Sequence, residues 1–525
     1  MTNLRTTNLS AILFSGMLLG NIYSGHAHPL IADADADADA APAQRTGIRA
    51  VAATEWRTIP VDMLGINAET PYGPSWDDPR LMRQTEALCA GHLRYPGGCV
   101  SNYMDWRTGQ YMAADLRDPA RSQIRIPMRG GAREVQTYRP QELRRILDRT
   151  GATPLIAVNM LTDTLESTLE MLAYMRTLDI PIKYVELGNE FYLTYDMGGN
   201  QKKGIVGDYA KPYHYPTAES YAQEAKRWAE AINAVYPDAQ VAYMAVGWPS
   251  NVGWVKSCPR TAGWNDTMRR MMPDMKYVTM HRYASAQTTD PLEAFRLTQS
   301  EFSEMSKLIR HKFADKRIWV TEYNNKGGSG PKGYPYNAMA GTWIHGINLL
   351  EATLILMETP QVDLLCVYNL SPWFMQSLVF APGTRIPAEP GGKATLDTKP
   401  YALTSSGVTF QLLAQAARNA SRMLPLRFEA NPTLDCTGGE VKTLHGALFA
   451  ESDACRGILI NLGGRDITVD LSGVNGTAGM TSAKQVSAAS LEMPITGPES
   501  LSSRRSKIGP DRTVKLKPFS VTLLQ

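Results

Sequence analysis

The feature that most constrains this chain is a regular alternation of short apolar runs with longer helix-like stretches between residues 60 and 420. Runs of this length and composition are typical of strands buried in a parallel sheet. Their alternation with helices indicates repeated βα units. There are eight such runs, which predicts an α/β fold of the (β/α)8 or TIM-barrel class, and they lie at 61–67, 91–97, 154–160, 183–189, 240–247, 276–283, 317–323 and 362–370.

Three of the intervening stretches have clear helix signals. Residues 140–150 are followed by Gly151, Thr217 precedes a stretch that stops before Pro237, and residues 407–419 would form the last helix. The rival architecture, an open doubly wound sheet, would carry a glycine-rich phosphate-binding turn after its first strand. No such turn follows residues 61–67, so we expect a closed catalytic barrel over residues 60–420.

After residue 420 the pattern changes to short alternating runs at 457–463, 466–472 and 513–524, separated by Gly, Asn, Ser and Pro. This spacing is typical of antiparallel sheets. We therefore expect a C-terminal antiparallel β-sandwich formed by residues 421–525, to which residues 47–59 add a strand.

The N-terminus has the anatomy of an export signal. A basic start at Arg5 is followed by an apolar stretch, 9–20, and a small-x-small sequence at 25–27. About twelve apolar residues are too few to cross a bilayer roughly 30 Å thick. We expect a signal peptide at 1–27 and an Asp/Ala-rich linker at 28–46, hence a secreted or periplasmic protein that is not membrane-bound after signal removal.

Charge and cysteine content exclude several classes of protein. The 54 basic and 51 acidic residues give a net charge of +3, which argues against nucleic acid as a partner. The six cysteines include no CxxC pair, and there is no HExxH or GxSxG motif, so we expect neither a metal nor a cofactor nor a serine nucleophile. Export permits disulfides, and Cys436 and Cys455 flank one strand-like run, which predicts a bridge between them. For Cys99 and Cys366 we expect buried, unpaired thiols.

Polar residues collect where the predicted strands end. Catalytic groups of TIM barrels lie at these carboxyl ends, and here they include Glu190 after the fourth strand and Glu322 on the seventh. Two carboxyl groups facing each other across the barrel mouth suit glycoside cleavage, because one protonates the leaving oxygen while the other attacks or activates water.

Two sets of motifs carry a family resemblance. Gly188-Asn189-Glu190, with Glu322 after Trp319-Val-Thr, resembles the clan A glycoside hydrolases. The segment 93–99 (LRYPGGC), with Tyr103, Trp106 and Gly109, is similar to the strand-two region of the α-L-arabinofuranosidase family of that clan. That family also has a C-terminal β-sandwich joined by the N-terminal segment. The resemblance implies a retaining glycoside hydrolase acting on plant or bacterial polysaccharide or oligosaccharide.

The resemblance also implies roles for individual residues. Glu190 would be the acid/base, with a raised pKa, and Glu322 the nucleophile. Arg94 would orient Glu322, although it could instead pair with the structural carboxylate Glu186. The remaining implied roles are contacts with the sugar or with Glu322, and they fall on Asn189 (the sugar 2-hydroxyl), Tyr283 and His281 (contact with or orientation of Glu322) and Glu69 (a sugar hydroxyl).

Two questions stay open at this level. Trp373, after the eighth strand, is placed to stack on a sugar or to pack within its loop. The chain departs from the arabinofuranosidase pattern at Phe191, at Thr321 (more often acidic) and at Tyr323 (usually Trp), which leaves the substrate undecided. The β-glucuronidase and heparanase family, acting on an acidic polysaccharide, is the rival enzyme, and a non-catalytic carbohydrate-binding protein is the rival class.

Overall fold

The computed structural model describes residues 47–68, 74–111, 138–193, 215, 217–256, 259–326, 337–371, 376–452 and 454–525. The expected signal peptide (1–27) and linker (28–46) lie outside these residues, as do the candidate sugar-binding residues Glu69 and Trp373. Within the described ranges, no helix is both long and apolar enough to cross a membrane.

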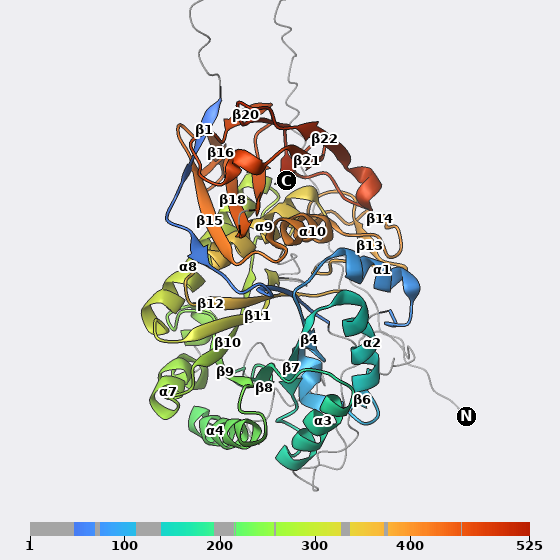
Figure 1. The fold of residues 1–525 in the computed structure, drawn as a ribbon, viewed down its shortest axis with the longest axis vertical. Coiled ribbons are helices and arrows are strands. Elements are labelled where there is room, and N and C mark those ends of the chain that lie inside the picture. Colours follow the sequence, from blue (N-terminus) through green and yellow to red (C-terminus); the bar gives the residue numbers. More distant parts are fainter. Residues whose placement is uncertain are drawn as a thin grey trace, which may run out of the picture. The chain divides into compact units, whose positions relative to one another are not determined.

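The predicted barrel is confirmed: eight parallel strands close in the order β10-β11-β12-β3-β4-β7-β8-β9 (Figure 1). All but a few of their residues are buried, because helices cover the outside of the barrel and side chains fill its interior. The strands are β3 (Leu64–Asn67), β4 (His92–Tyr95), β7 (Thr153–Val158), β8 (Tyr184–Leu187), β9 (Gln240–Val246), β10 (Tyr277–Ala284), β11 (Arg317–Asn325) and β12 (Val362–Tyr368).

Two of the three predicted helices begin and end where the sequence signals predict, whereas the last, expected over 407–419, is α10 at Ser405–Ala417. Gly151 terminates α2 in the left-handed region at φ 69, where a Cβ would be strained, and the Thr217 hydroxyl caps α4 by accepting from the Ser220 N–H. The helices that follow the barrel strands are α1 (Pro79–Ala87), α2 (Pro140–Thr150), α3 (Leu165–Thr177), α4 (Ala218–Val235), α7 (Trp264–Met271), α8 (Pro291–Lys312), α9 (Trp343–Met357) and α10 (Ser405–Ala417).

Short elements occupy the loops that join these strands and helices. They are the 3-10 helix η2 (Gly98–Tyr103), the helices α5 (Gly253–Lys256) and α6 (Pro259–Ala262), and the hairpins formed by β5 (Met104–Asp105) with β6 (Gln110–Tyr111) and by β13 (Arg385–Pro387) with β14 (Thr395–Asp397).

Strands from residues 47–59 and from residues 421–525 form a ten-stranded sheet that curls around a core of its own. Its strand pairs are antiparallel as expected, except that β1 runs parallel to β20, so the sheet is mixed. The strands are β1 (Ile48–Ala52), β2 (Arg57–Thr58), β15 (Arg422–Phe428), β18 (Leu444–Glu451), β19 (Ala454–Asn461), β20 (Ile467–Asp470), β21 (Ser482–Ser487), β22 (Ser502–Lys507), β23 (Thr513–Leu516) and β24 (Ser520–Leu524).

The predicted Cys436–Cys455 disulfide is wrong, because both thiols are free. Cys436 ends β16 (Thr433–Cys436), which pairs only with β17 (Gly439–Lys442) and lies against α8, where the thiol donates to Glu293 Oε2 at 3.4 Å. Cys455 lies in β19 of the large sheet, opposite Ala450. The two cysteines thus belong to separate sheets rather than to one hairpin. Cys366 is buried and free, as expected.

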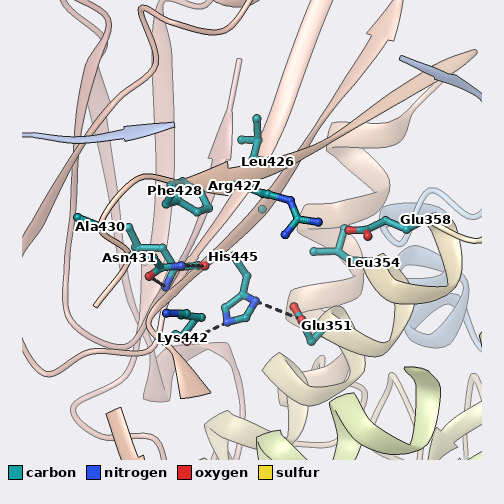
Figure 2. A pocket seen from close by; sticks show the side chains of 12 residues that line it. Glu351, Leu354, Glu358, Leu426, Arg427, Phe428, Ala430, Asn431, Lys442 and His445 are labelled. Atoms are coloured by element: carbon teal, nitrogen blue, oxygen red, sulfur yellow. Dashed lines mark hydrogen bonds and ion pairs between the residues drawn. The ribbon is translucent and has the colours of Figure 1, made fainter. Parts of the chain in front are cut away.

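An ion pair joins the curled sheet to the barrel helices. His445 of β18 points at Glu351 of α9, with Nδ1 and Oε1 3.2 Å apart, in a pocket between the two elements (Figure 2). Burial would lower the pKa of His445, but the Glu351 carboxylate outweighs it and raises that pKa above its ordinary value. Glu351 itself also accepts from the Gln299 amide at 2.8 Å.

This pair predicts a pH-dependent stability. Because the pKa of His445 is raised in the folded protein, the ion pair contributes fully to the free energy of unfolding below the pKa of an unfolded histidine, about 6.5. That contribution is lost as the pH rises through the pKa of His445 in the folded state. Replacing His445 by Gln leaves a buried carboxylate without its counterion, and should lower the free energy of unfolding by about 3 kcal/mol at pH 6. Urea unfolding at pH 6 and at pH 9 measures both the loss and its decline.

The matched control is E351Q combined with H445Q. Removing both charges should cost less stability than the sum of the single substitutions, since no unpaired buried charge remains. Additive losses that do not depend on pH would contradict the assignment.

Candidate active site

The carboxyl ends of four barrel strands bring the candidate residues together. All are buried or half-buried, and the guanidinium of Arg94 and the carboxyl of Glu186 are almost completely shielded from solvent. The residues are Arg94 on β4, Glu186 on β8, Asn189 and Glu190 in the loop after β8, His281 and Tyr283 on β10, and Thr321 and Glu322 on β11.

Arg94 connects this group. Its Nε donates to Glu186 Oε2 at 2.6 Å, its Nη1 to Glu322 Oε1 at 2.8 Å and its Nη2 to Asn189 Oδ1 at 2.8 Å. The two roles considered for Arg94, orienting Glu322 and pairing with Glu186, therefore both occur. Burial alone would raise the pKa of the Glu186 carboxyl, but Arg94 and His281 lower it to about 2. Glu186 is therefore an anion at any physiological pH.

Glu322 is held at both carboxylate oxygens. Arg94 donates to Oε1, and the Tyr283 hydroxyl donates to Oε2 at 2.6 Å. The expected contact between Tyr283 and Glu322 is therefore present. These two donors fix the plane of the carboxylate, and a charge-assisted pair of this kind is stronger than neutral hydrogen bonds.

The loop that carries Glu190 has an unusual backbone. Gly188 and Glu190 both lie in the left-handed region, at φ 78 and φ 51, which for glutamate is a strained conformation. The Asn102 side chain holds the residue between them: its Nδ2 donates to the Asn189 carbonyl at 2.8 Å, and its Oδ1 accepts from the Asn189 N–H at 3.0 Å. The buried Asn189 Nδ2 has no partner among the described residues, so it remains a donor for a ligand.

A β-bulge on β11 sets the direction of Thr321 and Glu322. Met280 of β10 lies opposite Val320 and His281 lies opposite Glu322, so Thr321 is the additional residue of the bulge. Successive residues of a regular strand point to opposite faces, and a bulge alters that alternation. Here the Thr321 hydroxyl reaches Glu186 and His281 while the Glu322 carboxylate reaches Arg94 and Tyr283.

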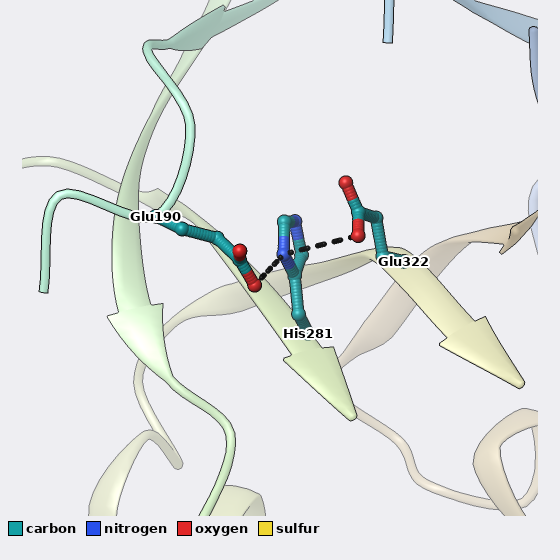
Figure 3. A group of neighbouring side chains, drawn as sticks. All are labelled: Glu190, His281 and Glu322. Carbon is teal, nitrogen blue, oxygen red and sulfur yellow. Dashed lines mark hydrogen bonds and ion pairs between the residues drawn. The ribbon is translucent and has the colours of Figure 1, made fainter. Parts of the chain in front are cut away.

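His281 lies between the two candidate catalytic glutamates (Figure 3). Its Nδ1 is 2.8 Å from Glu190 Oε1 and 3.7 Å from Glu322 Oε2, so its hydrogen bond is with Glu190. Burial would lower the pKa of His281, but Glu322 and Glu190 raise it to about 10.

The expected raised pKa of Glu190 is wrong for this structure. Burial would raise the pKa of its carboxyl, but the charge and hydrogen bond of His281, with a hydrogen bond from the Tyr192 hydroxyl, lower it. The sequence placed a second carboxylate near Glu190 but gave no sign that a cation would lie between them.

Glu190, His281 and Glu322 also offer the geometry of a cation site, since one ligand atom from each lies within 4.8 Å of the others. Both imidazole nitrogens are already engaged, Nδ1 with Glu190 and Nε2 with the Thr321 hydroxyl at 3.0 Å. Metal binding would break one of these bonds and would require the neutral imidazole. The donor set therefore fits a proton-sharing group better than a resident metal.

The sequence analysis assigned no active role to Glu186 and Thr321 of this group, or to Asn102, which contacts it. Glu186 had a detectable signal, because a charged residue in the middle of a fully buried strand needs a partner. Thr321 stood out only as a departure from a family pattern. Asn102 had no signal at all, since its contact with Asn189 joins loops that are distant in the sequence.

No protein-family model and no curated protein matches the sequence. Among solved structures, the fold is similar to a GH51 arabinofuranosidase from Xanthomonas axonopodis pv. citri (16% identity, TM-score 0.63, 91% of this chain and 99% of that one). It is also similar to an α-L-arabinofuranosidase from Thermotoga maritima in complex with arabinose (15%, TM-score 0.62, 91% and 99%). A 4-O-α-L-rhamnosyl-β-D-glucuronidase from Fusarium oxysporum matches less well (13%, TM-score 0.53, 91% and 100%). Over 91% of its length the chain thus has the fold of GH51 arabinofuranosidases.

The Arg94 contacts predict distinct effects of two substitutions. R94A leaves two buried carboxylates without their common counterion and should lower the free energy of unfolding by about 3–5 kcal/mol. R94K keeps the charge but presents one nitrogen in place of the three donors, so it should recover part of that stability. Urea unfolding of both variants measures the difference. Equal losses for R94A and R94K would show that charge compensation is not what Arg94 contributes.

Proposed function

We propose that this protein is a secreted or periplasmic retaining glycoside hydrolase that cleaves plant or bacterial polysaccharide or oligosaccharide in the manner of the arabinofuranosidases. The observation that carries the proposal is the opposed pair Glu190 and Glu322, which have carboxylate oxygens within 4.8 Å of each other. Retaining glycosidases separate their two carboxyl groups by about 5–5.5 Å, and inverting enzymes by roughly 6.5–9.5 Å. The short separation supports a double displacement.

Glu322 is suited to be the nucleophile. Arg94 and Tyr283 bind one oxygen each and hold the carboxylate in a fixed orientation. In the first step a Glu322 oxygen would bond to the anomeric carbon as the bond to the leaving oxygen breaks. In the second step a water oxygen would bond to the anomeric carbon and the ester to Glu322 would break.

Glu190 is suited to be the acid/base, because it shares a proton with His281 across 2.8 Å. In the first step that pair would supply the proton that the leaving oxygen takes up, and in the second it would take a proton back from the attacking water. The first step also neutralises Glu322, one of the two carboxylates that hold the proton on His281. The imidazole would therefore release its proton to Glu190 more easily as the reaction proceeds.

An arabinofuranoside is the first candidate substrate. The better structural match is to arabinofuranosidases, one of which is an arabinose complex, and the free Asn189 Nδ2 would donate to a sugar hydroxyl beside the anomeric carbon. A β-glucuronide is the second candidate, favoured by the match to the Fusarium glucuronidase and by the net charge of +3. Aryl arabinofuranoside, glucuronide, xyloside and glucoside assays distinguish these substrates.

The nucleophile assignment predicts that E322A abolishes hydrolysis of any substrate that the wild type cleaves. Loss of a covalent nucleophile typically lowers kcat by several powers of ten, here at least about 10⁴-fold. E322Q is the matched control, since it keeps the size of the side chain and its contact with Arg94. Full activity in either variant would exclude Glu322 as nucleophile and favour a non-catalytic role for the site.

The acid/base assignment predicts a dependence on the leaving group. E190A should retain most of its kcat/KM on substrates with good leaving groups, such as dinitrophenyl glycosides, and lose about 10²–10⁴-fold of it on poor ones, because only the latter need protonation in the first step. On the good leaving groups kcat should still fall, because the second step has lost its base. Added azide should restore turnover by replacing the activated water, giving a glycosyl azide of retained configuration. An equal loss on both substrate classes would contradict the role.

A further inference from the structure

Thr321 is a buried residue that the proposed reaction leaves without a role. It is fully shielded from solvent, it is the additional residue of the β11 bulge, and it precedes the nucleophile in the chain. Its hydroxyl lies between two groups of the site: it donates to Glu186 Oε1 at 2.9 Å and lies 3.0 Å from His281 Nε2.

Of its two neighbours, the Thr321 hydroxyl can donate its hydrogen bond only to Glu186. Glu186 is ionised beside Arg94, and an ionised carboxylate only accepts hydrogen bonds. Thr321 has a single hydroxyl proton, which it gives to Glu186. Toward His281 its oxygen can therefore only accept, and Nε2 must carry the hydrogen of that bond.

We propose that Thr321, held by Glu186, is a positioning residue that keeps the Nε2 hydrogen on His281, so that Nδ1 and Glu190 share the one proton used in acid/base catalysis. This inference rests on the proposed function of Glu190. With Nε2–H held in place, the pair has two states that differ only by transfer of that proton: a Glu190 carboxylate beside an imidazolium, and a Glu190 carboxylic acid beside a neutral imidazole.

The groups facing His281 support this assignment. On one side of the ring, Nδ1 lies 2.8 Å from Glu190 and 3.7 Å from Glu322. On the other side, Nε2 contacts the Thr321 hydroxyl, and Nε2 lies 3.9 Å from Glu186 Oε1. Arg94 neutralises part of the charge on Glu186 and Glu322, and Tyr283 donates to Glu322. An acidic residue at position 321 would place a further full negative charge against Nε2, whereas a threonine hydroxyl fixes the hydrogen without that charge.

The test compares T321V, which has the same shape without the hydroxyl, with T321S, which keeps it. In the ¹⁵N spectrum of histidine-labelled protein, assigned by loss of the His281 signals in H281Q, wild type and T321S should show a protonated Nε2 throughout the titration. In T321V the neutral imidazole should carry its hydrogen on Nδ1, and its pKa should fall by about one unit or more, because the charged form loses a hydrogen-bond acceptor.

The kinetic arm uses a substrate that the wild type cleaves. In T321V the alkaline limb of kcat/KM should move down by about one pH unit, with a larger loss of kcat on poor leaving groups than on good ones, and T321S should behave as wild type. T85V is the matched control, because Thr85 is a buried threonine on α1 whose hydroxyl bonds only the Leu81 carbonyl among the described residues. T321A serves if T321V does not fold.

An Nε2 hydrogen and an alkaline limb that are both unchanged in T321V would overturn the inference. The spectroscopic arm needs no turnover, so it separates the two proposals: a wild type inactive on every glycoside would contradict the proposed function, while the ¹⁵N spectra would still decide whether Thr321 sets the tautomer of His281.

Discussion

The buried guanidinium of Arg94 is the interaction on which the candidate active site depends. From β4 it donates to Glu186 on β8, to Glu322 on β11 and to Asn189 in the loop after β8. It therefore connects three strands that are not neighbours in the barrel. A buried charge is costly unless it is paired and hydrogen-bonded. Arg94 and the two carboxylates satisfy one another, and each would be strongly unfavourable without the others. The same contacts place the carboxylate that we propose as nucleophile.

Around Arg94 and its two carboxylate partners, the backbone departs from regular geometry where a side chain must be redirected. The bulge on β11 lets the consecutive residues Thr321 and Glu322 contact different partners. The left-handed backbone at Glu190 is stabilised by the two hydrogen bonds between Asn102 and Asn189, one donated by each residue. Bulges and strained residues are common at functional sites because they direct side chains in ways that a regular strand cannot. Together they place Glu190 and Glu322 on either side of His281, so that both carboxylates raise the pKa of one imidazole.

Local patterns predicted those parts of the structure that depend on local rules. The eight apolar runs became the eight barrel strands, Gly151 and Thr217 mark the ends of helices, and the strand-end positions of Glu190 and Glu322 led to the right mouth of the barrel. The errors concern contacts between distant segments. The Cys436–Cys455 bridge failed because the intervening residues divide between two sheets, and the pKa of Glu190 moved the other way because His281 lies between the carboxyl groups.

The sequence by itself determined that the chain alternates strands and helices, that these close into a barrel, and that two glutamates stand at its carboxyl end. Periodicity and helix caps act within a few residues, and parallel strands must end at the same face, so this information is local. Only the tertiary structure decided which charges touch. Whether His281 would pair with Glu190 or with Glu322, and whether Arg94 would serve one carboxylate or two, depended on the register of β10 and β11 and on the bulge at Thr321. A shift of one residue in that register redirects every side chain beyond it, and nothing in the local sequence announces it.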